Sequence, residues 1–319
     1  MKILLTGSSG WLGRHLAPLL DARGDDVVGL DIGPGAHTRV IGSVADRGLV
    51  DRLFDAHGFE AVLHAGALHK PDIARYPVQA FVDVNVTGTL ALLEAAARTG
   101  ASRFVFTSTT SLMISTAIRE GQGGEAAWLD ESLSPLLPRN IYGVTKRAAE
   151  ELCRLFHDER GLPVLILRTG RFFPEDDDTH RALSGENMKA NELLHRRLTA
   201  EDAAAAHVAA LDRAPGIGFG TYILSAPTPF ARSDAGELKR DARAVIARLF
   251  PDAEYLYARA GWALPETIDR VYDAGLAERE LGFRCATDFA GVLAALRTGA
   301  ALPFAHDADY VSPKEQVGT

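Results

Sequence analysis

A glycine-rich segment near the N-terminus restricts the possible folds of this chain more than any other feature. The apolar run at residues 3–5 is followed by Gly7, Gly10 and Gly13, each three residues from the next. A Gly-x-x-Gly-x-x-Gly turn between a strand and a helix lets backbone N–H groups approach a pyrophosphate at the helix N-terminus. The pattern alone is a weak signal, so its meaning depends on the rest of the chain.

A tyrosine and a lysine much further along the chain form a second candidate motif. Tyr142 and Lys146 stand four residues apart in a segment with a helical pattern. Residues at this spacing lie on one helix face, where the lysine ammonium can lower the pKa of the phenol. Behind the glycine turn, this pair makes nicotinamide redox chemistry the leading interpretation.

Short aliphatic segments alternate with longer helical patterns through the first half of the chain. This alternation predicts an α/β fold with a doubly wound parallel sheet of the Rossmann type. Ligands of such sheets bind beyond the carboxyl ends of the strands, near a topological switch point. The predicted strands are 2–5, 26–30, 61–64, 103–107 and 164–168, and the predicted helices are 12–22, 46–57, 78–99 and 142–160.

Two segments interrupt this rhythm, and it weakens toward the end of the chain. Residues 120–138 are rich in Gly, Pro and acidic residues and predict a long surface loop, whereas 174–191 predict an excursion from the sheet. The part after residue 227 predicts a smaller substrate-covering region, with a loosely held tail after Pro303. The expected division is an NAD-binding Rossmann domain at 1–172, to which 193–226 return, and a substrate-binding region at 173–192 and 227–319.

Composition excludes several classes of protein. The 34 basic and 42 acidic residues give a formal net charge of −8 with no basic tract, which disfavours nucleic acid and anionic membranes as partners. No apolar run approaches the roughly 18 residues of a spanning helix, and no signal-peptide pattern follows Met1. Cys153 and Cys285 are too few for a disulfide framework or a cysteine zinc site. No His/Asp/Glu cluster has metal-ligand spacing, so we expect no bound metal. Because no signal-peptide pattern and no spanning run are seen, we expect a cytoplasmic protein.

Asp31 indicates which dinucleotide is bound. It ends the second predicted strand, 18 residues after Gly13. An acid there can accept hydrogen bonds from the ribose 2′ and 3′ hydroxyls and would repel a 2′-phosphate, which favours NAD over NADP. The alternative is a surface turn acid, and Arg14 could contact a 2′-phosphate, so NADP stays open as the less favoured cofactor.

The third predicted strand and the helix after it add two further candidates. Small residues at 64–67 let the backbone pass close to a ligand. Asn85 is a polar amide on a helix that otherwise repeats Ala and Leu, so it needs a partner if it is buried. That partner is either the cofactor or a neighbouring strand.

These motifs resemble the extended short-chain dehydrogenase/reductase superfamily, in particular its NAD-dependent epimerase/dehydratase family, which includes sugar-nucleotide 4-epimerases. The resemblance covers residues 1–225 well and the remainder more loosely. It rests on residues 6–13, 64–67, 85–89, 106–109 and 167–168, on Asp31, Tyr142 and Lys146, and further on 198–203 and 277–283.

The resemblance implies a catalytic trio and a homodimer. Thr109 is expected to bind the substrate oxygen that becomes a carbonyl, Tyr142 to transfer the hydroxyl proton, and Lys146 to hold the nicotinamide ribose and stabilise the phenolate. The helices at 78–99 and 142–160 are expected to pack as a four-helix bundle between two copies. The expected cofactor contacts are Gly7, Ser9, Gly10, Trp11, Leu12, Gly13, Asp31, Ile32, Ser43, Val44, His64, Ala65, Gly66, Ala67, Asn85, Thr107, Ser108, Tyr142, Lys146 and Gly170.

Departures from the family pattern bear on the substrate. Thr110 and Ser111 stand where 4,6-dehydratases carry Asp-Glu, which disfavours that reaction. Arg171 replaces the usual Asn and could grip a phosphate or carboxylate, or else pair with the acidic run at 175–178. The diphosphate-binding Arg expected near residue 263 is missing, although Arg196, Arg197 or Arg270 could substitute. The expected substrate contacts are His69, Thr109, Thr110, Ser111, Tyr142, Arg171, Phe172, Arg197 and Trp262.

Three functions fit these residues. The first is an NAD-dependent epimerase or oxidoreductase that acts on a hydroxyl or keto centre of a sugar or sugar-nucleotide-like small molecule. The second is an NAD(P)-dependent dehydrogenase or ketoreductase with an exchangeable cofactor. The third is a non-catalytic NAD-binding regulator, which has no need of Thr109, Tyr142 and Lys146 together.

Overall fold

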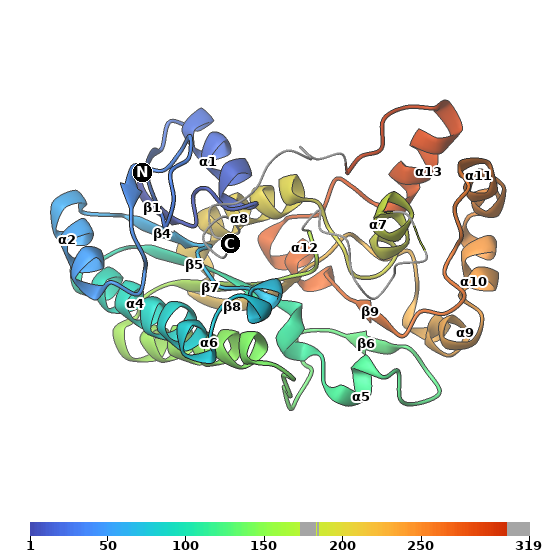
Figure 1. The fold of residues 1–319 in the computed structure, drawn as a ribbon, viewed down its shortest axis with the longest axis horizontal. Helices are drawn as coiled ribbons and strands as arrows, with labels where there is room; N and C mark the ends of the chain where they lie inside the picture. Colours follow the sequence, from blue (N-terminus) through green and yellow to red (C-terminus); the bar gives the residue numbers. More distant parts are fainter. Residues whose placement is uncertain (173–182, 184, 305–319) are drawn as a thin grey trace.

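The computed structural model describes residues 1–172, 183 and 185–304, and its centre is a seven-stranded sheet (Figure 1). The strand order is β3-β2-β1-β4-β5-β7-β8, and every adjacent pair is parallel. The order reverses between β1 and β4, which confirms the predicted doubly wound fold with its switch point. The strands are β1 (Lys2–Thr6), β2 (Asp26–Asp31), β3 (Val40–Ile41), β4 (Ala61–His64), β5 (Arg103–Thr109), β7 (Val164–Thr169) and β8 (Phe219–Leu224).

Helices cover both faces of this sheet. On one face α1 (Gly13–Ala22) and α8 (Ala200–Ile217) pack together, and on the other α2 (Arg47–His57), α4 (Gly88–Thr99) and α6 (Ile141–Arg160) do so. Alternate residues of β1 supply the two cores, because Ile3 and Leu5 face α1 and α8 whereas Leu4 faces the other layer. Strands buried on both faces read as continuous apolar runs, which is why the sequence marked them clearly.

The helix predicted at 78–99 is interrupted by a π turn. It begins as α3 (Val78–Val82), widens into a π-helical turn at Asp83–Thr87, and continues as α4. By length and composition the segment could cross a membrane, but it packs on the sheet between α2 and α6 and half of it is buried. Single π turns often lie at functional sites, and this one holds Asn85.

A second apolar core organises a C-terminal lobe beside the sheet (Figure 1). The predicted surface loop at 120–138 is wrong in part, because it contains β6 (Ala127–Leu129), which pairs in parallel with β9 (Arg270–Tyr272). Its three residues are too few to show a period, and their partner lies more than 140 residues away. The lobe contains α7 (Gly185–Leu193), α9 (Ala235–Arg240), α10 (Ala242–Leu249), α11 (Ala253–Ala260) and α13 (Phe289–Thr298); α5 (Thr116–Arg119) precedes β6, and α12 (Gly275–Leu281) packs on α8 and β8.

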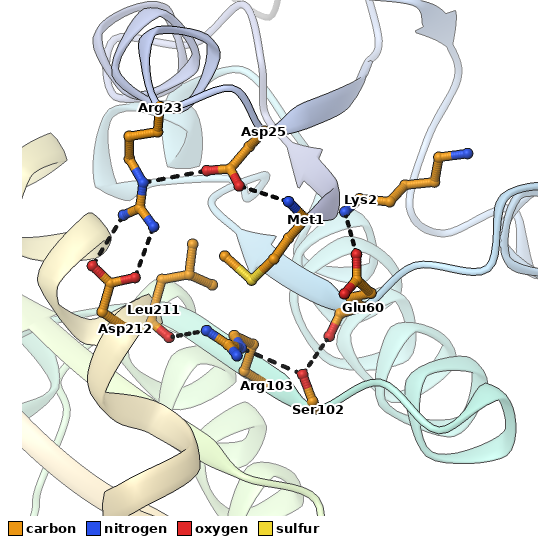
Figure 2. A network of polar contacts seen from close by, with 9 residues as sticks. All are labelled: Met1, Lys2, Arg23, Asp25, Glu60, Ser102, Arg103, Leu211 and Asp212. Atoms are coloured by element: carbon orange, nitrogen blue, oxygen red, sulfur yellow. Dashed lines mark hydrogen bonds and ion pairs between the residues drawn. The ribbon is translucent and has the colours of Figure 1, made fainter.

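A polar network ties the amino ends of the strands together, at the edge opposite the carboxyl ends (Figure 2). No ligand is expected at this edge, because ligands of such sheets bind beyond the carboxyl ends of the strands. The contacts join the Met1 amino group to Asp25 (2.9 Å), Arg23 to Asp25 (3.3 Å) and to Asp212 (2.8 and 3.1 Å), Lys2 N to Glu60 (2.8 Å), Ser102 to Glu60 O (3.0 Å), Arg103 to Ser102 (3.3 Å), and Arg103 to Leu211 O (3.2 Å).

Candidate active site

The glycine turn lies between β1 and α1 with its backbone pressed against two neighbouring segments. Gly7 has φ of +72°, and a Cβ there would lie 2.8 Å from the Gly66 nitrogen. A Cβ on Gly13 would lie only 2.1 Å from the Gly7 oxygen, so neither position tolerates a side chain. The turn leads into α1, whose first N–H groups form the positive end of the helix dipole. This arrangement fits the pyrophosphate of a dinucleotide.

Asp31 lies where the sequence predicted it, at the end of β2 beside the glycine turn. One carboxylate oxygen accepts a hydrogen bond from Ser9 N (2.8 Å) and the other from Ile32 N (2.7 Å). These two contacts hold the carboxylate beside the glycine turn. The Ser9 hydroxyl hydrogen-bonds Thr38 (2.5 Å), so this end of the site is ordered by the chain itself. Ser43 and Val44 follow β3 nearby, with Val44 packed on Gly88.

The side chain of His64 faces the interior of the fold. Its two ring nitrogens hydrogen-bond Thr6 (2.7 Å) and Thr89 (3.0 Å), so it joins β1, β4 and α4. Burial lowers the pKa of His64 well below its usual value, helped by the nearby Lys146, so the ring is neutral. The His64 ring is therefore committed to the interior of the fold, and the expected cofactor contacts of 64–67 stay a prediction.

Asn85 is held by protein groups rather than left for the cofactor. Its Oδ1 accepts from Leu68 N (2.9 Å), and its Nδ2 donates to Leu68 O (3.0 Å) and to the Thr145 hydroxyl (3.1 Å). The geometry supports the structural alternative, with the loop after β4 and not a strand as the main partner. Asn85 connects that loop to α6, next to Lys146.

The hydroxyls of Thr107 and Ser108 are also committed to the interior. The Thr107 hydroxyl contacts His207 Nε2 (2.8 Å), whose pKa burial lowers to about 4, whereas Ser108 donates to Glu150 (2.5 Å) on the opposite face of β5. Because side chains alternate along a strand, only the residue at its very end can face a ligand from beyond the sheet. Both hydroxyls have partners within the chain, and the expected cofactor contacts of Thr107 and Ser108 stay a prediction.

Thr109, Tyr142 and Lys146 are brought together at the carboxyl edge. Thr109 ends β5, and Tyr142 lies in the first turn of α6, which begins at the Asn140 cap (Asn140 Oδ1 accepts from Gly143 N, 2.9 Å). The Thr109 hydroxyl lies near enough to the Tyr142 phenol to lower its pKa by hydrogen bonding. Lys146 follows one turn later on the same face of α6 and is 3% exposed.

The electrostatics of this group differ from the expectation. Burial raises the pKa of Tyr142 above its usual range, Asp72 raises it further, and the Thr109 hydrogen bond lowers it. The expected lowering by Lys146 is not among these causes. Burial lowers the pKa of Lys146 to about 7, and its ammonium lies 4.1 Å from the centre of the Phe106 ring. The phenol is therefore protonated at neutral pH.

His69 lies beside the phenol, supported by an acid that the sequence analysis missed. The edge of its ring meets the Tyr142 ring at 5.8 Å between centroids. Its backbone N–H donates to Asp72 (2.6 Å), a fully buried residue on the 3₁₀ turn Lys70–Ala74. Asp72 stands three residues after His69, which is the spacing of a helix-capping acid and the signal that could have found it.

Three of the predicted arginines surround one buried acid and differ in how exposed they are. Arg197 (2.8 Å), Arg196 (2.8 Å) and Arg171 (3.6 Å) all pair with Glu192, a buried acid of α7 whose pKa the three guanidiniums lower to about 2 against the opposing effect of burial. The side chains of Arg197, Arg196 and Arg171 are 4%, 13% and 24% exposed, so Arg171 is the most exposed of the three. The acidic run expected to pair with Arg171 lies outside the described residues.

The remaining substrate candidates lie in less accessible places. The Thr110 hydroxyl donates to Thr169 O (3.2 Å), Phe172 is buried in the core under α1 and α8, and Trp262 packs on Tyr257 in the C-terminal lobe. Ser111 donates its N–H to the Thr109 hydroxyl (3.1 Å), so it lies next to the reacting group. Gly170 packs on Arg196 O, and a Cβ there would lie 2.8 Å from that oxygen. Within the described residues, no cluster of three His, Cys, Asp or Glu could hold a metal ion.

A glycine turn, an acid at the end of β2 and a Tyr-x-x-x-Lys helix lie at one edge of the sheet. The model of the NAD dependent epimerase/dehydratase family matches residues 3–219, and the chain belongs to this family. The resemblance inferred from the sequence is thereby confirmed, and with it NAD as the cofactor class.

Named relatives within the family differ in their reactions. A dTDP-glucose 4,6-dehydratase of Xanthomonas campestris pv. campestris is 34% identical over 185 residues, which are 51% of this chain and 50% of that protein. A uronate dehydrogenase of Pseudomonas syringae pv. tomato is 28% identical over 180 residues, 54% of this chain and 60% of that protein. This chain therefore spans about half the length of the curated relatives it matches.

Solved structures share the fold over nearly the whole chain. A short-chain dehydrogenase/reductase superfamily protein from Agrobacterium tumefaciens with bound NAD has a TM-score of 0.65 at 23% identity, covering 93% of this chain and 96% of that one. The UDP-N-acetylglucosamine 4-epimerase from Bacillus cereus has a TM-score of 0.62 at 22% identity, covering 91% and 95%. At such identities the likeness shows the fold alone.

The Asp31→Ala substitution should weaken NAD binding and narrow the preference for NAD over NADP. Loss of one or two charge-assisted hydrogen bonds corresponds to about 1.5–3 kcal/mol, or roughly 10- to 150-fold in Kd. Titration calorimetry with both dinucleotides measures this. Asp26→Ala, at the exposed start of the same strand, is the matched control and should bind normally. An unchanged NAD affinity for Asp31→Ala would contradict the assignment.

Proposed function

We propose that this protein is an NAD-dependent epimerase or oxidoreductase that acts on a hydroxyl or keto centre of a sugar or sugar-nucleotide-like substrate. The observation that carries the proposal is the arrangement of Thr109 at the end of β5 and of Tyr142 and Lys146 one turn apart on one face of α6, with the Thr109 hydroxyl near enough to lower the pKa of the Tyr142 phenol. Gly7, Gly13 and Asp31 are suited to place a nicotinamide cofactor at the same sheet edge. A regulator that only binds NAD would not need this trio.

The proposed mechanism follows from the protonation states of these groups. Tyr142 carries its proton at neutral pH, so it is ready to donate to a substrate carbonyl and must lose that proton before it can accept one. Thr109, whose hydroxyl lies near the phenol, would bind the same substrate oxygen. Bound NAD would supply the hydride acceptor and donor. Lys146 would hold the nicotinamide ribose with its ammonium.

The family's 4,6-dehydratase reaction is the least supported of the reactions that the relatives carry out. Thr110 and Ser111 stand where that reaction needs two carboxyl groups, and the Thr110 hydroxyl is bound to Thr169 O. Without a nearby acid and base at those positions, loss of water is not assisted. Epimerisation with retained cofactor is our first choice, and net dehydrogenation or ketoreduction with exchange of NAD is the alternative.

A specific observation favours the alternative substrate class, a sugar without a nucleotide diphosphate. At the position where a diphosphate-binding Arg is expected, the backbone of Ala263 is tied to α7: its N–H donates to Asn187 (2.9 Å), and its carbonyl accepts from Asn187 and Asn191 (2.9 Å each). Arg171, two residues after β7, is the most exposed of the three arginines around Glu192 and would bind an acidic group of the substrate. Its planar guanidinium suits a carboxylate or a phosphate.

The homodimer expected from the resemblance would use the outward face of the helices at 78–99 and 142–160. Leu92, Ala96 and Ala149, which lie on these two helices, are buried within the chain against the sheet. The apolar side chains that α6 leaves exposed are Val144 (49%) and Leu155 (44%), which lie eleven residues apart on one helix face. We propose that this face of α6 pairs with its copy in a second chain.

The Tyr142→Phe substitution should lower turnover by about 100-fold or more and leave NAD affinity and the melting temperature nearly unchanged. It removes only the oxygen that transfers the proton, and such groups typically contribute 10²- to 10⁴-fold. Nucleotide sugars and free sugar acids form the substrate panel, with and without added NAD. The control is Tyr222→Phe, which removes the phenol oxygen of a β8 residue that hydrogen-bonds Glu280. Wild-type turnover by Tyr142→Phe would remove this residue from the mechanism.

Light scattering at micromolar concentration should give the mass of two chains. The double substitution Val144→Asp/Leu155→Asp should shift the protein to a single chain, because it places charges on the proposed contact. Leu249→Asp, an equally exposed leucine at the end of α10, should leave the dimer intact. A wild-type protein that is strictly monomeric would refute the proposed interface.

A further inference from the structure

A buried acid lies one helical turn beyond Lys146. Glu150 of α6 is almost inaccessible, and both of its oxygens accept hydrogen bonds from charged or hydroxyl donors. Oε1 accepts from the Ser108 hydroxyl (2.5 Å) and from Arg168 Nε (3.0 Å), and Oε2 accepts from Arg168 Nη2 (2.7 Å). A paired, fully hydrogen-bonded carboxylate of this kind is the form in which buried charge is tolerated.

These three residues join the elements that carry the proposed catalytic group. Ser108 precedes Thr109 on β5, Arg168 lies on β7, and Glu150 lies on the helix that bears Tyr142 and Lys146. The two strands are fastened once more beside the cluster, where the Thr169 hydroxyl donates to Ser108 O (3.0 Å). The position of Thr109 relative to α6 therefore depends on Ser108–Glu150–Arg168, which we call the buried cluster.

The surroundings of Lys146 contain few charges. From β4 it is faced by His64, which is neutral, and from β5 by the Phe106 ring, whose face attracts a cation. On α6 itself, burial raises the pKa of the Cys153 thiol, so that this group is uncharged as well.

The nearby charges that remain are those of the buried cluster and the 3₁₀ turn. Arg168 of β7 is bound to Glu150, and Asp72 of the turn at 70–74 acts on Tyr142. Burial lowers the pKa of Lys146, and Cys153 and Glu150 both raise it. Because the buried Cys153 thiol is itself uncharged, the carboxylate of Glu150 is the negative charge on α6 that favours the ammonium form of Lys146.

We propose that Glu150 is a positioning residue for this site, whose buried charge keeps Lys146 in its ammonium form and whose bond to Ser108 holds the strand end that bears Thr109. The inference rests on the proposed function, because it assumes that Lys146 must be charged to hold the nicotinamide ribose. Glu150 touches neither substrate nor cofactor and acts only through Lys146 and Ser108.

The titration of Lys146 can be measured directly, without substrate or turnover. The chain has six lysines, so NMR of protein labelled with ¹³C at lysine Cε gives few signals, and Lys146→Arg assigns the one of interest. Glu150→Gln should move the Lys146 midpoint to lower pH by about one unit, because loss of a nearby negative charge disfavours the ammonium. Glu150→Asp keeps the negative charge, so its Lys146 midpoint should lie close to that of the wild type. The pH above which NAD affinity falls should be lower in Glu150→Gln, by the same amount as the Lys146 midpoint.

Two further variants keep the test decisive. Glu150→Gln leaves Arg168 buried without its partner, so if it fails to fold, Glu150→Gln/Arg168→Met removes both charges and is measured instead. Ser108→Ala keeps the ion pair, and it should leave the Lys146 midpoint in place while lowering kcat. A folded protein without the Glu150 charge whose Lys146 titrates as in the wild type would overturn the proposal.

The outcome is separable from that of the proposed function. If Tyr142→Phe kept full activity, the mechanism would fail although the shift in the Lys146 titration could still be present. If instead Tyr142→Phe is inactive and Lys146 titrates identically with and without Glu150, the mechanism stands and the role of Glu150 is refuted.

Discussion

The central strands β1, β4, β5 and β7 have helices packed on both faces, so side chains in the middle of these strands are buried in one of two cores. Chemistry is left to the carboxyl edge, where each strand stops and its next residues face outward. The glycine turn, Asp31 and Thr109 all stand at such ends. The amino edge is closed by the network of Figure 2, which contributes order and no site.

Polar groups just beneath this edge decide which side chains remain for a ligand. His64, Asn85, Thr107 and Ser108 are satisfied by buried partners on four different elements. Each of these contacts joins a strand or loop to a helix, and the one between Ser108 and Glu150 ties β5 to α6. Thr109 and Tyr142 are held near each other because the residues behind them leave little freedom.

The fold could be predicted from the sequence because buried parallel strands and long amphipathic helices leave strong patterns, whereas β3, β6 and β9 are too short to leave one. The site could be predicted only where a residue's role follows from its spacing, as for Gly13, Asp31 and the Tyr142–Lys146 pair. Burial could not be read in this way. The sequence does not show that Ser108 and Arg168 converge on Glu150, or that burial rather than Lys146 sets the protonation of Tyr142, because these depend on contacts between distant segments.

The proposed function depends on whether this chain binds NAD and retains it through turnover. The most direct measurement is the absorbance spectrum and mass analysis of the small molecules released when the purified protein is denatured. An enzyme that retains its cofactor should release NAD in amounts nearly stoichiometric with the chain. Protein that is purified free of NAD but reduces added NAD with an alcohol substrate would select the dehydrogenase alternative. Protein that releases no NAD and binds none when NAD is added would contradict the account.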